Sequence, residues 1–378
     1  MQNTYLKSFD VVIVGGGVIG LAVAWRAAQR GLRTVVLERG EPGGGASRVA
    51  AGMLAPTGEA SFGEDALLRL NLASAARYPA FVEELREASG HAVSILECGT
   101  LMVARDRDEA EALERELAFR AEHALPAERL LPTPARRAEP ALAPTLRLAV
   151  ELPHDHAIDP RALCAALAAA ARGAGVELRG GAEVTGLTLA GDRVAGVELA
   201  GGARVAAGQV VVAAGAWSSA LVPAAAHVPV RPVKGQILRL RDPAGPGLLA
   251  RVIRMATGYL VPRGDGRYVL GASVEERGFD PHVTAGAVFE LLRDATELVP
   301  GVAELAIEET SVGYRPGTPD NAPVLGPGAL AGLQWATGHY RHGVLLAPIT
   351  AELLAASLTG EGTPDAAFGA GRFAGVHA

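Results

Sequence analysis

Residues 10–38 constrain this chain more than any other stretch. An apolar run over residues 11–14 predicts a buried strand, and a helix-like segment over 18–29 follows it. Between the two lie three glycines in the spacing G-x-G-x-x-G, namely Gly15, Gly17 and Gly20. A second apolar run, 34–37, ends at Glu38. This order of strand, glycine turn, helix, strand and acid is typical of a βαβ unit that binds a dinucleotide.

Each of these residue types has a chemical reason. Gly17 has no side chain, so a pyrophosphate can approach the backbone, and Gly20 lets the helix pack close to the sheet. The helix N-terminus presents free N–H groups and the positive end of its dipole to phosphate. The carboxylate of Glu38 can accept both ribose hydroxyls and disfavours a 2′-phosphate, so NADP is not expected.

A second glycine-rich stretch follows Glu38 and favours FAD over NAD. Residues 42–56 are mostly glycine and alanine, which allows the backbone to run close to a flat ligand. The chain has one dinucleotide fingerprint and no dithiol, so one resident cofactor is expected. The glycines at 43–45 and the turn at Gly343 suggest a ligand longer than NAD. An NAD-binding protein or a non-enzymatic dinucleotide sensor stays open as an alternative.

Composition limits the class of protein. A length of 378 residues, with 49% hydrophobic and 20% charged residues, suits a globular protein of two domains. The net charge of −6 gives no indication of a nucleic-acid surface. Cys98 and Cys164 are far apart and form no C-x-x-C, so we expect reduced thiols, no metal site and a cytoplasmic protein. The apolar run 344–358 is too short for a bilayer, so no membrane association is expected.

The pattern predicts an α/β plus α+β fold, in which a Rossmann-like FAD-binding domain is interleaved with an antiparallel-sheet substrate domain. Segments that suit a parallel sheet lie at the start, the middle and the end of the chain, and runs that suit antiparallel strands fall between them. The expected FAD-binding domain comprises residues 1–80, 145–225 and 308–378. The expected substrate-binding domain comprises residues 81–144 and 226–307.

Six segments in order carry a family resemblance. They are the glycine turn at 15–20, AAGML at 50–54, VKG at 233–235, GYLVPR at 258–263, GYRPGT at 313–318 and GHYRHG at 338–343. Together they resemble the D-amino-acid oxidase superfamily and, within it, the glycine oxidases of thiamine biosynthesis. The resemblance spans nearly the whole chain, and AAGML, YRPGT and GHYRHG are its most discriminating parts.

The resemblance implies a flavoenzyme that oxidises glycine and similar small amines to an imine. Hydrolysis would give the 2-oxo acid and ammonia, and O2 would reoxidise the flavin and yield hydrogen peroxide. No cysteine lies near the C-terminal segment 338–345, so non-covalent FAD is expected. The expected partners are the amino-acid substrate and O2, and the resemblance also implies a homo-oligomer.

The resemblance also assigns site residues. Arg315, Arg341 and Tyr259 would contact the substrate as catalytic residues, because a guanidinium offers a carboxylate two parallel charge-assisted hydrogen bonds. Met53 and Val274 would line the substrate pocket. The residues expected to contact FAD, in part through the backbone, are Gly15, Gly17, Val18, Ile19, Gly20, Glu38, Arg39, Ala46, Ser47, Ala51, Gly52, Met53, Val184, His339, Tyr340, Arg341, His342, Gly343, Val344 and Leu345.

Three departures from the family pattern leave the substrate size open. His342 stands where similar proteins often have Asn, Arg48 where an aromatic residue is common, and Val274 where Met is common. If hydride passes directly from the α-carbon to the flavin, no side-chain base is needed there. A D-amino-acid dehydrogenase that reduces a membrane quinone, or a sarcosine oxidase-like enzyme of the same fold, stays open as an alternative.

Overall fold

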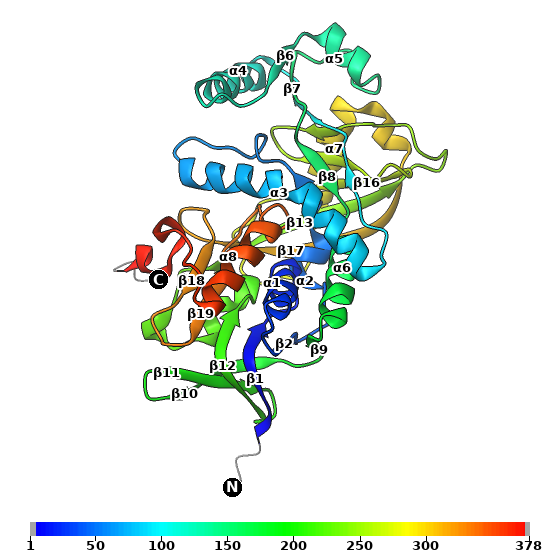
Figure 1. Ribbon diagram of the computed structural model, residues 1–378. Helices are drawn as coiled ribbons and strands as arrows, with labels where there is room; N and C mark the ends of the chain where they lie inside the picture. Colours follow the sequence, from blue (N-terminus) through cyan, green and yellow to red (C-terminus); the bar gives the residue numbers. More distant parts are fainter. Residues whose placement is uncertain (1–4, 375–378) are drawn as a thin grey trace.

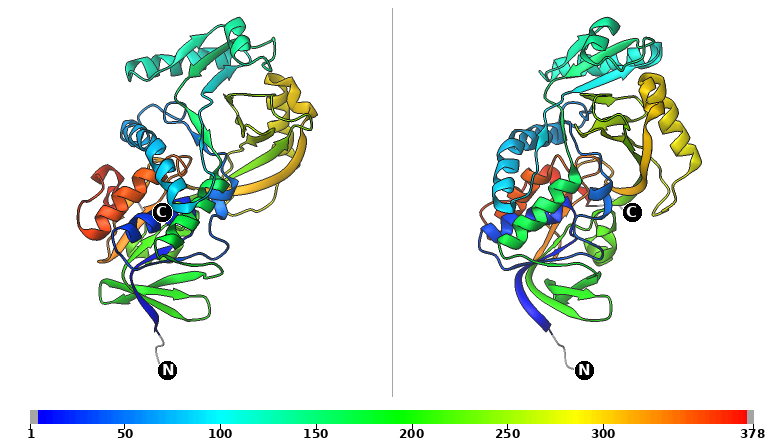
Figure 2. Two further views of the ribbon diagram at one scale, coloured as in Figure 1. Left: turned by 45° about the vertical axis from the view of Figure 1, so that its right-hand side comes forward. Right: turned by 90° about the vertical axis from the view of Figure 1, so that its right-hand side faces the viewer.

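The computed structural model describes residues 5–374, with side chains from residue 8. Within that range two eight-stranded sheets organise the molecule, and β3, β8 and β4 form a small third sheet. In Figure 1 the first large sheet, with β1 and β12, lies at the lower end, and the second lies at the upper end with α7. Figure 2 shows the same separation from two further sides. No helix within residues 5–374 has the length and apolar character that a membrane span requires.

The first sheet contains the dinucleotide-binding unit. Its strands follow the order β10-β11-β12-β1-β2-β9, and β19 adds to β12 and also pairs with β18. β1 runs parallel to both β2 and β12, as the βαβ pattern predicts. The strand bounds are β1 Tyr5–Val14, β2 Thr34–Leu37, β9 Glu177–Arg179, β10 Val184–Ala190, β11 Arg193–Leu199, β12 Arg204–Val212, β18 Val324–Pro327 and β19 Leu333–Thr337.

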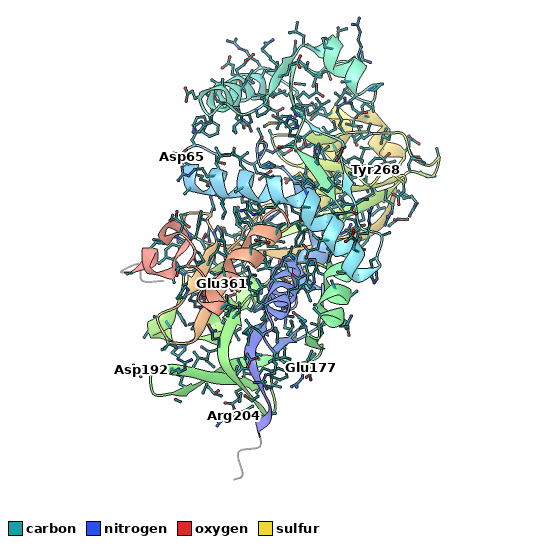
Figure 3. All side chains as sticks on the ribbon, in the orientation of Figure 1. Asp65, Glu177, Asp192, Arg204, Tyr268 and Glu361 are labelled. Atoms are coloured by element: carbon teal, nitrogen blue, oxygen red, sulfur yellow. The ribbon has the colours of Figure 1, made fainter. Side chains whose placement is uncertain are left out.

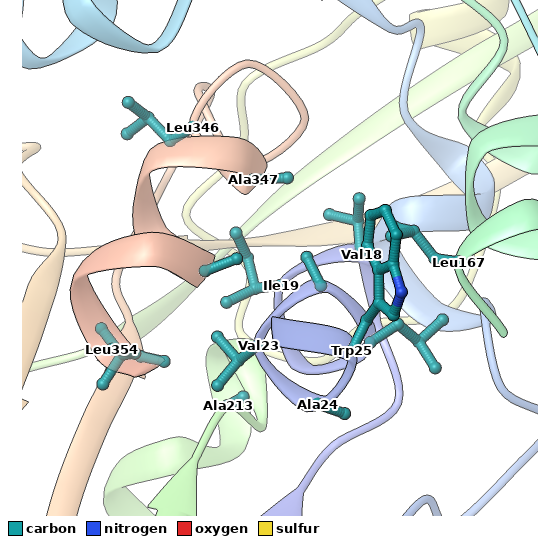
Figure 4. Packing of buried hydrophobic residues seen from close by; sticks show 14 of the residues in the cluster. Val18, Ile19, Val23, Ala24, Trp25, Leu167, Ala213, Leu346, Ala347 and Leu354 are labelled. Atoms are coloured by element: carbon teal, nitrogen blue, oxygen red, sulfur yellow. The ribbon is translucent and has the colours of Figure 1, made fainter. Parts of the chain in front are cut away.

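The central helix α1, Val18–Gln29, is apolar on nearly every side, and ten of its twelve residues are buried. It packs against α6, Pro160–Gly173, and α8, Ala347–Thr359. Figure 4 shows Trp25 of α1 beside Leu167 of α6, and Val23 on the side of α1 that faces α8. Burial on all sides explains why α1 lacks the single apolar stripe of a surface helix.

The second sheet has the order β17-β13-β16-β15-β14-β5-β7-β6. It is antiparallel except for one parallel pair, β5 with β14. The longest pairing joins β13 and β17, and places Val233 opposite Arg315 and Gly235 opposite Gly313. The bounds are β5 Thr100–Ala104, β6 Glu128–Leu130, β7 Leu148–Leu152, β13 Arg231–Arg241, β14 Val252–Arg254, β15 Tyr259–Pro262, β16 Arg267–Gly271 and β17 Ala306–Gly317.

The expected domain ranges differ from the strand pairing in two places. β7 and most of β17 fall in ranges expected for the FAD-binding domain, yet both strands pair in the second sheet. The strand β17 leads from the second sheet into the turn before β18, so a boundary drawn at residue 308 cuts through it. The division into two domains otherwise stays a prediction.

The remaining elements cover the sheets. The long helix α3, Asp65–Ser89, crosses the expected boundary at residue 80. The sequence pattern predicts a helix over 108–123 that is capped by Asp108. Helix α4 instead begins after Asp106, whose side chain accepts from the Glu109 amide, so that predicted cap is wrong. Figure 3 labels Asp65 at the start of α3, Tyr268 in the second sheet, and Glu177 near the first sheet. The further bounds are α2 Gly45–Val49, β3 Met53–Leu54, β4 Ile95–Leu96, α4 Arg107–Glu122, α5 Pro132–Ala138, β8 His156–Ile158, α7 Ala285–Leu298 and the 3-10 helices Gly215–Leu221, Ala224–Ala226, Pro300–Glu304, Ala366–Phe368 and Ala370–Phe373.

Candidate active site

A cavity of about 710 Å³ is lined by residues of both large sheets. Val14 and Ala213 contribute from the carboxyl ends of parallel strands, where open α/β sheets bind their ligands. Ile237, Tyr259 and Gly313 contribute from the second sheet. The volume lies within the range of pockets that hold cofactors and drug-sized ligands.

The glycine turn closes the first sheet side of the cavity. Gly15 has φ +105°, and a Cβ there would lie 2.5 Å from the Ala213 oxygen. A Cβ on Gly20 would lie 1.9 Å from the Gly15 oxygen, so α1 approaches the strand too closely for any side chain. Gly17 caps α1 without a side-chain acceptor, and the Val18 amide donates to Ser47 Oγ at 2.9 Å. The N-terminus of α1, with the positive end of the helix dipole, faces a part of the cavity that suits a pyrophosphate.

Glu38 lies where a ribose is expected. Its Oε2 accepts from the Gly16 amide at 2.7 Å, and its Oε1 accepts from the Gly40 amide at 2.9 Å. Each carboxylate oxygen keeps a further lone pair for a hydroxyl. The Arg39 guanidinium lies 3.7 Å from the centroid of the Trp217 ring, and both residues line the cavity. Sequence reasoning gave Trp217 no role in the site, although it lies shortly after the apolar end of β12, in the 3-10 helix Gly215–Leu221.

The segment 338–346 forms another wall, and its histidines are buried. His339 Nε2 lies 3.0 Å from Thr350 Oγ1, and burial lowers the pKa of His339 to about 3. His342 Nδ1 lies 3.3 Å from Asn71 Nδ2, and burial also lowers the pKa of His342. Both rings are therefore neutral near pH 7. Tyr340 takes a left-handed conformation, with φ 46°.

Helix α3 holds this segment from behind. The Ser74 hydroxyl donates to the Leu345 carbonyl at 2.6 Å, and the Tyr78 hydroxyl donates to the Val344 carbonyl at 2.7 Å. Sequence reasoning missed these supports. The available signal was three polar residues, Asn71, Ser74 and Tyr78, at helical spacing on the apolar stripe of α3.

Arg315 projects from β17 over Gly235 of the neighbouring strand. A Cβ on Gly235 would lie 2.4 Å from Arg315 Nη1. That nitrogen donates to the Ser273 carbonyl at 3.1 Å and the Lys234 carbonyl at 3.4 Å. Within residues 8–374 no carboxylate forms an ion pair with Arg315. N–H groups of its guanidinium therefore remain to bind an anionic ligand in the cavity.

Tyr259 lies close to Arg315 at the start of β15. A Cβ on Gly271 would lie 2.9 Å from the Tyr259 hydroxyl oxygen, so this ring also needs a glycine beside it. Burial raises the pKa of Tyr259, and Arg315 offsets part of that rise. The phenol therefore stays protonated at neutral pH and can donate a hydrogen bond.

Val274 borders the same region from the segment after β16. The residue is 55% exposed. Lys234 ties this segment to β13, because its Nζ donates to Asp280 Oδ2 and to the His282 carbonyl, each at 2.7 Å. The small Val274 side chain therefore stands at the cavity's margin on an anchored segment.

A carboxylate that sequence reasoning did not find lies in this part of the cavity. Glu59 lies 3.3 Å from Arg254 Nε and 3.8 Å from Arg341 Nη1. Burial acts to raise the pKa of Glu59, but the charges of Arg254, Arg341 and Arg315 outweigh it and hold the pKa below its usual value. No sequence pattern marked Glu59, because its cationic partners come from distant segments.

The cavity brings together nearly every residue named from the sequence. All of the expected substrate residues and all of the expected cofactor residues except Gly20 line it. Gly20 instead allows the close approach of α1 to the glycine turn. The individual roles of these residues toward ligands stay predictions.

The fold and the cavity together define a class. A sheet with a parallel centre and the dinucleotide fingerprint, joined to a second sheet that supplies an arginine without a carboxylate partner in residues 8–374, suits a dinucleotide-dependent oxidoreductase. A family model described as FAD dependent oxidoreductase matches residues 10–357. The chain belongs to this family, and FAD is its cofactor.

Relatives narrow the comparison. The chain is 38% identical over 348 residues to the "Bifunctional protein ThiO/ThiG" of Trichormus variabilis, covering 92% of this chain but only 52% of that protein. It therefore spans about half the length of that relative. It is 38% identical over 350 residues to a glycine oxidase of Geobacillus kaustophilus, with 92% of each chain covered. The crystal structure of glycine oxidase from that organism matches with a TM-score of 0.89 and 37% identity, covering 96% of this chain and 98% of that one.

Proposed function

We propose that this protein oxidises glycine and other small amines or D-amino acids to the 2-oxo acid, ammonia and hydrogen peroxide. The observation that carries the proposal is Arg315, a cavity-lining guanidinium without a carboxylate partner in residues 8–374. An amino acid needs such an anchor for its own carboxylate. The similarity to glycine oxidases over 92% of the chain supports the same reaction.

The residues of the chain have positioning roles in this proposal. Arg315 binds the substrate carboxylate as a fork, and the protonated Tyr259 donates a further hydrogen bond to it. Met53 lines the same cavity and limits the room for a side chain on the α-carbon. The surrounding arginines favour the neutral amine over the ammonium form, which leaves the nitrogen lone pair free.

FAD, when bound, accepts two electrons from the substrate and passes them to O2, which becomes hydrogen peroxide. The glycine turn, Glu38 and the segment 338–345 would hold it non-covalently. Because the α-carbon can give up a hydride directly, the chain needs no side-chain base at that atom. The contribution of the protein is orientation and the exclusion of water.

The test uses the purified holoenzyme. Flavin should be released by denaturation, and glycine, sarcosine and D-alanine should be compared for flavin reduction without O2 and for peroxide release with O2. We expect both signals with at least one of these amines. Reduction without peroxide would favour the dehydrogenase alternative, and no reduction by any of them would overturn the proposal.

We further propose a role in thiamine biosynthesis, a cytoplasmic location and a homo-oligomeric assembly. The ThiO/ThiG and glycine oxidase relatives support the pathway, and two free thiols, Cys98 and Cys164, suit a reducing compartment. Rescue of a thiamine-requiring glycine oxidase mutant tests the first proposal. Light scattering of the purified protein tests the assembly.

A further inference from the structure

Glu59 is held in place more firmly than a loop carboxylate usually is. The backbone just before Glu59 is held by Asp155, whose carboxylate accepts hydrogen bonds from the Thr57 and Gly58 amides. On the carbonyl side Arg120 donates to the Thr57 carbonyl at 3.0 Å. Asp155 and Arg120 are both fully buried. These hydrogen bonds fix the backbone just before Glu59 and restrict the orientation in which its side chain enters the cavity.

The position of Glu59 matters for the charge of the substrate pocket. Arg254, Arg315 and Arg341 all line the cavity close to it. Glu59 engages Arg254 and Arg341 at 3.3 Å and 3.8 Å, and leaves Arg315 without an ion-pair partner in residues 8–374. The nearby rings of His339 and His342 are neutral and add no positive charge.

We propose that Glu59 restricts this pocket to substrates with a single carboxylate. It occupies the two arginines that a second carboxylate would need, and it places a buried negative charge where that group would have to lie. Glycine, sarcosine and D-alanine satisfy this restriction. Amines with two carboxylates, such as iminodiacetate and D-aspartate, do not. This inference rests on the proposed function of the site as an amino-acid pocket.

The test compares ligands that need no turnover. Acetate and malonate are titrated into the holoenzyme, and binding is followed by the change in flavin absorbance. We expect Glu59→Gln to raise the affinity for malonate relative to acetate by about tenfold, since one partly buried charge is removed at short range. The ratio of kcat/KM for iminodiacetate to that for glycine should rise in the same direction.

Two variants serve as controls. Glu59→Asp keeps the charge and should keep the wild-type malonate-to-acetate ratio. Glu116→Gln removes a carboxylate 3.7 Å from Arg254 that does not line the cavity, and it should also leave the ratio unchanged. An unchanged ratio in Glu59→Gln, or an equal rise in Glu116→Gln, would overturn the inference. Failure of every amine to reduce the flavin would overturn the proposed function instead, because the ligand titration needs no reaction.

Discussion

At the scale of single residues, the anchor for the substrate carboxylate is the most direct test. Arg315→Ala should raise KM for glycine by about a hundredfold, because a charge-assisted bidentate contact to a partly buried carboxylate is lost. The flavin spectrum and its stoichiometry should stay unchanged. Steady-state peroxide assays measure the effect. Arg231→Ala is the matched control, since Arg231 is an exposed residue on the strand beside it, paired with Glu276. Equal kinetics in the two variants would refute the anchor role.

The glycine beneath Arg315 gives a second prediction. In Gly235→Ala the new Cβ would lie 2.4 Å from Arg315 Nη1, and the guanidinium would have to move, since it is the flexible end of a side chain. We expect the melting temperature to change little and the affinity for acetate to fall about tenfold. Gly186→Ala, where a Cβ meets nothing within 4 Å, is the control. A fall in melting temperature without a change in acetate affinity would contradict this reading.

The same residues show what the sequence alone could provide. Arg315 and Tyr259 could be predicted because each lies in a recognisable segment, and the cavity does bring them together. Glu59 and Trp217 could not, because their meaning comes from partners such as Arg254 and Arg39 that lie far away in the chain. Local sequence patterns predict where the backbone needs a particular residue type, but they do not predict which distant charged side chains will pair.

At the scale of elements, the contact between α1 and the glycine turn carries the next prediction. Gly20→Ala would place a Cβ 1.9 Å from a backbone oxygen that cannot yield, so α1 must shift. We expect a loss of about 3 kcal/mol in the free energy of unfolding and loss of flavin on purification. Urea unfolding and flavin stoichiometry measure both. Gly286→Ala in α7, where a Cβ meets nothing within 4 Å, should be neutral or stabilising by about 0.5 kcal/mol.

The segment before α8 should make stability depend on pH. The pKa of His339 is lowered to about 3, below its unfolded value of about 6.5, so the folded state resists protonation. Stability from this group is present above pH 6.5 and is lost as the pH falls from 6.5 toward 3. His339→Gln, which can keep the bond to Thr350, should show a shallower loss over that window. The free energy of unfolding is measured with urea at several pH values in the wild type and in His339→Gln. An equally steep fall with decreasing pH in both proteins would exclude His339 as the cause.

Element prediction from the sequence succeeded where periodicity and capping agreed. The sequence pattern predicts helices over 18–29 and 285–298, and α1 and α7 have those bounds. Asp159 followed by Pro160 predicts a helix start, and α6 begins there. The prolines in 126–144 predict an irregular connection, but this stretch forms β6 and α5. Its strand exists because β7 offers an edge to pair with, which local sequence cannot reveal.

At the scale of the whole molecule, FAD should stabilise both sheets together, since the cavity has walls from each. At about a hundred times its Kd, FAD should add about 2.7 kcal/mol and raise the Tm of the apoprotein by about 3 °C. FMN lacks the adenosine expected near Glu38 and should give a smaller shift. Differential scanning fluorimetry checks both ligands. Equal shifts would argue against the Glu38 end of the cavity as the adenosine site.

The pairing of β13 with β17 has a consequence for how such an enzyme can change over evolution. Side chains alternate faces along a strand, so a slip of one residue turns every side chain of that strand to the opposite face. Arg315 pairs with Val233, two residues along β17 from the Gly313–Gly235 pair, and both Arg315 and Gly313 line the cavity. With the start of β17 kept in register, a one-residue deletion early in the strand would bring Pro316 to the position of Arg315 and remove the guanidinium from that place. In this fold, the pairing of β13 with β17, which runs from Arg231–Gly317 to Arg241–Ala306, decides which side chain faces the flavin. Length changes in β17 should therefore disturb substrate choice more than most point substitutions do.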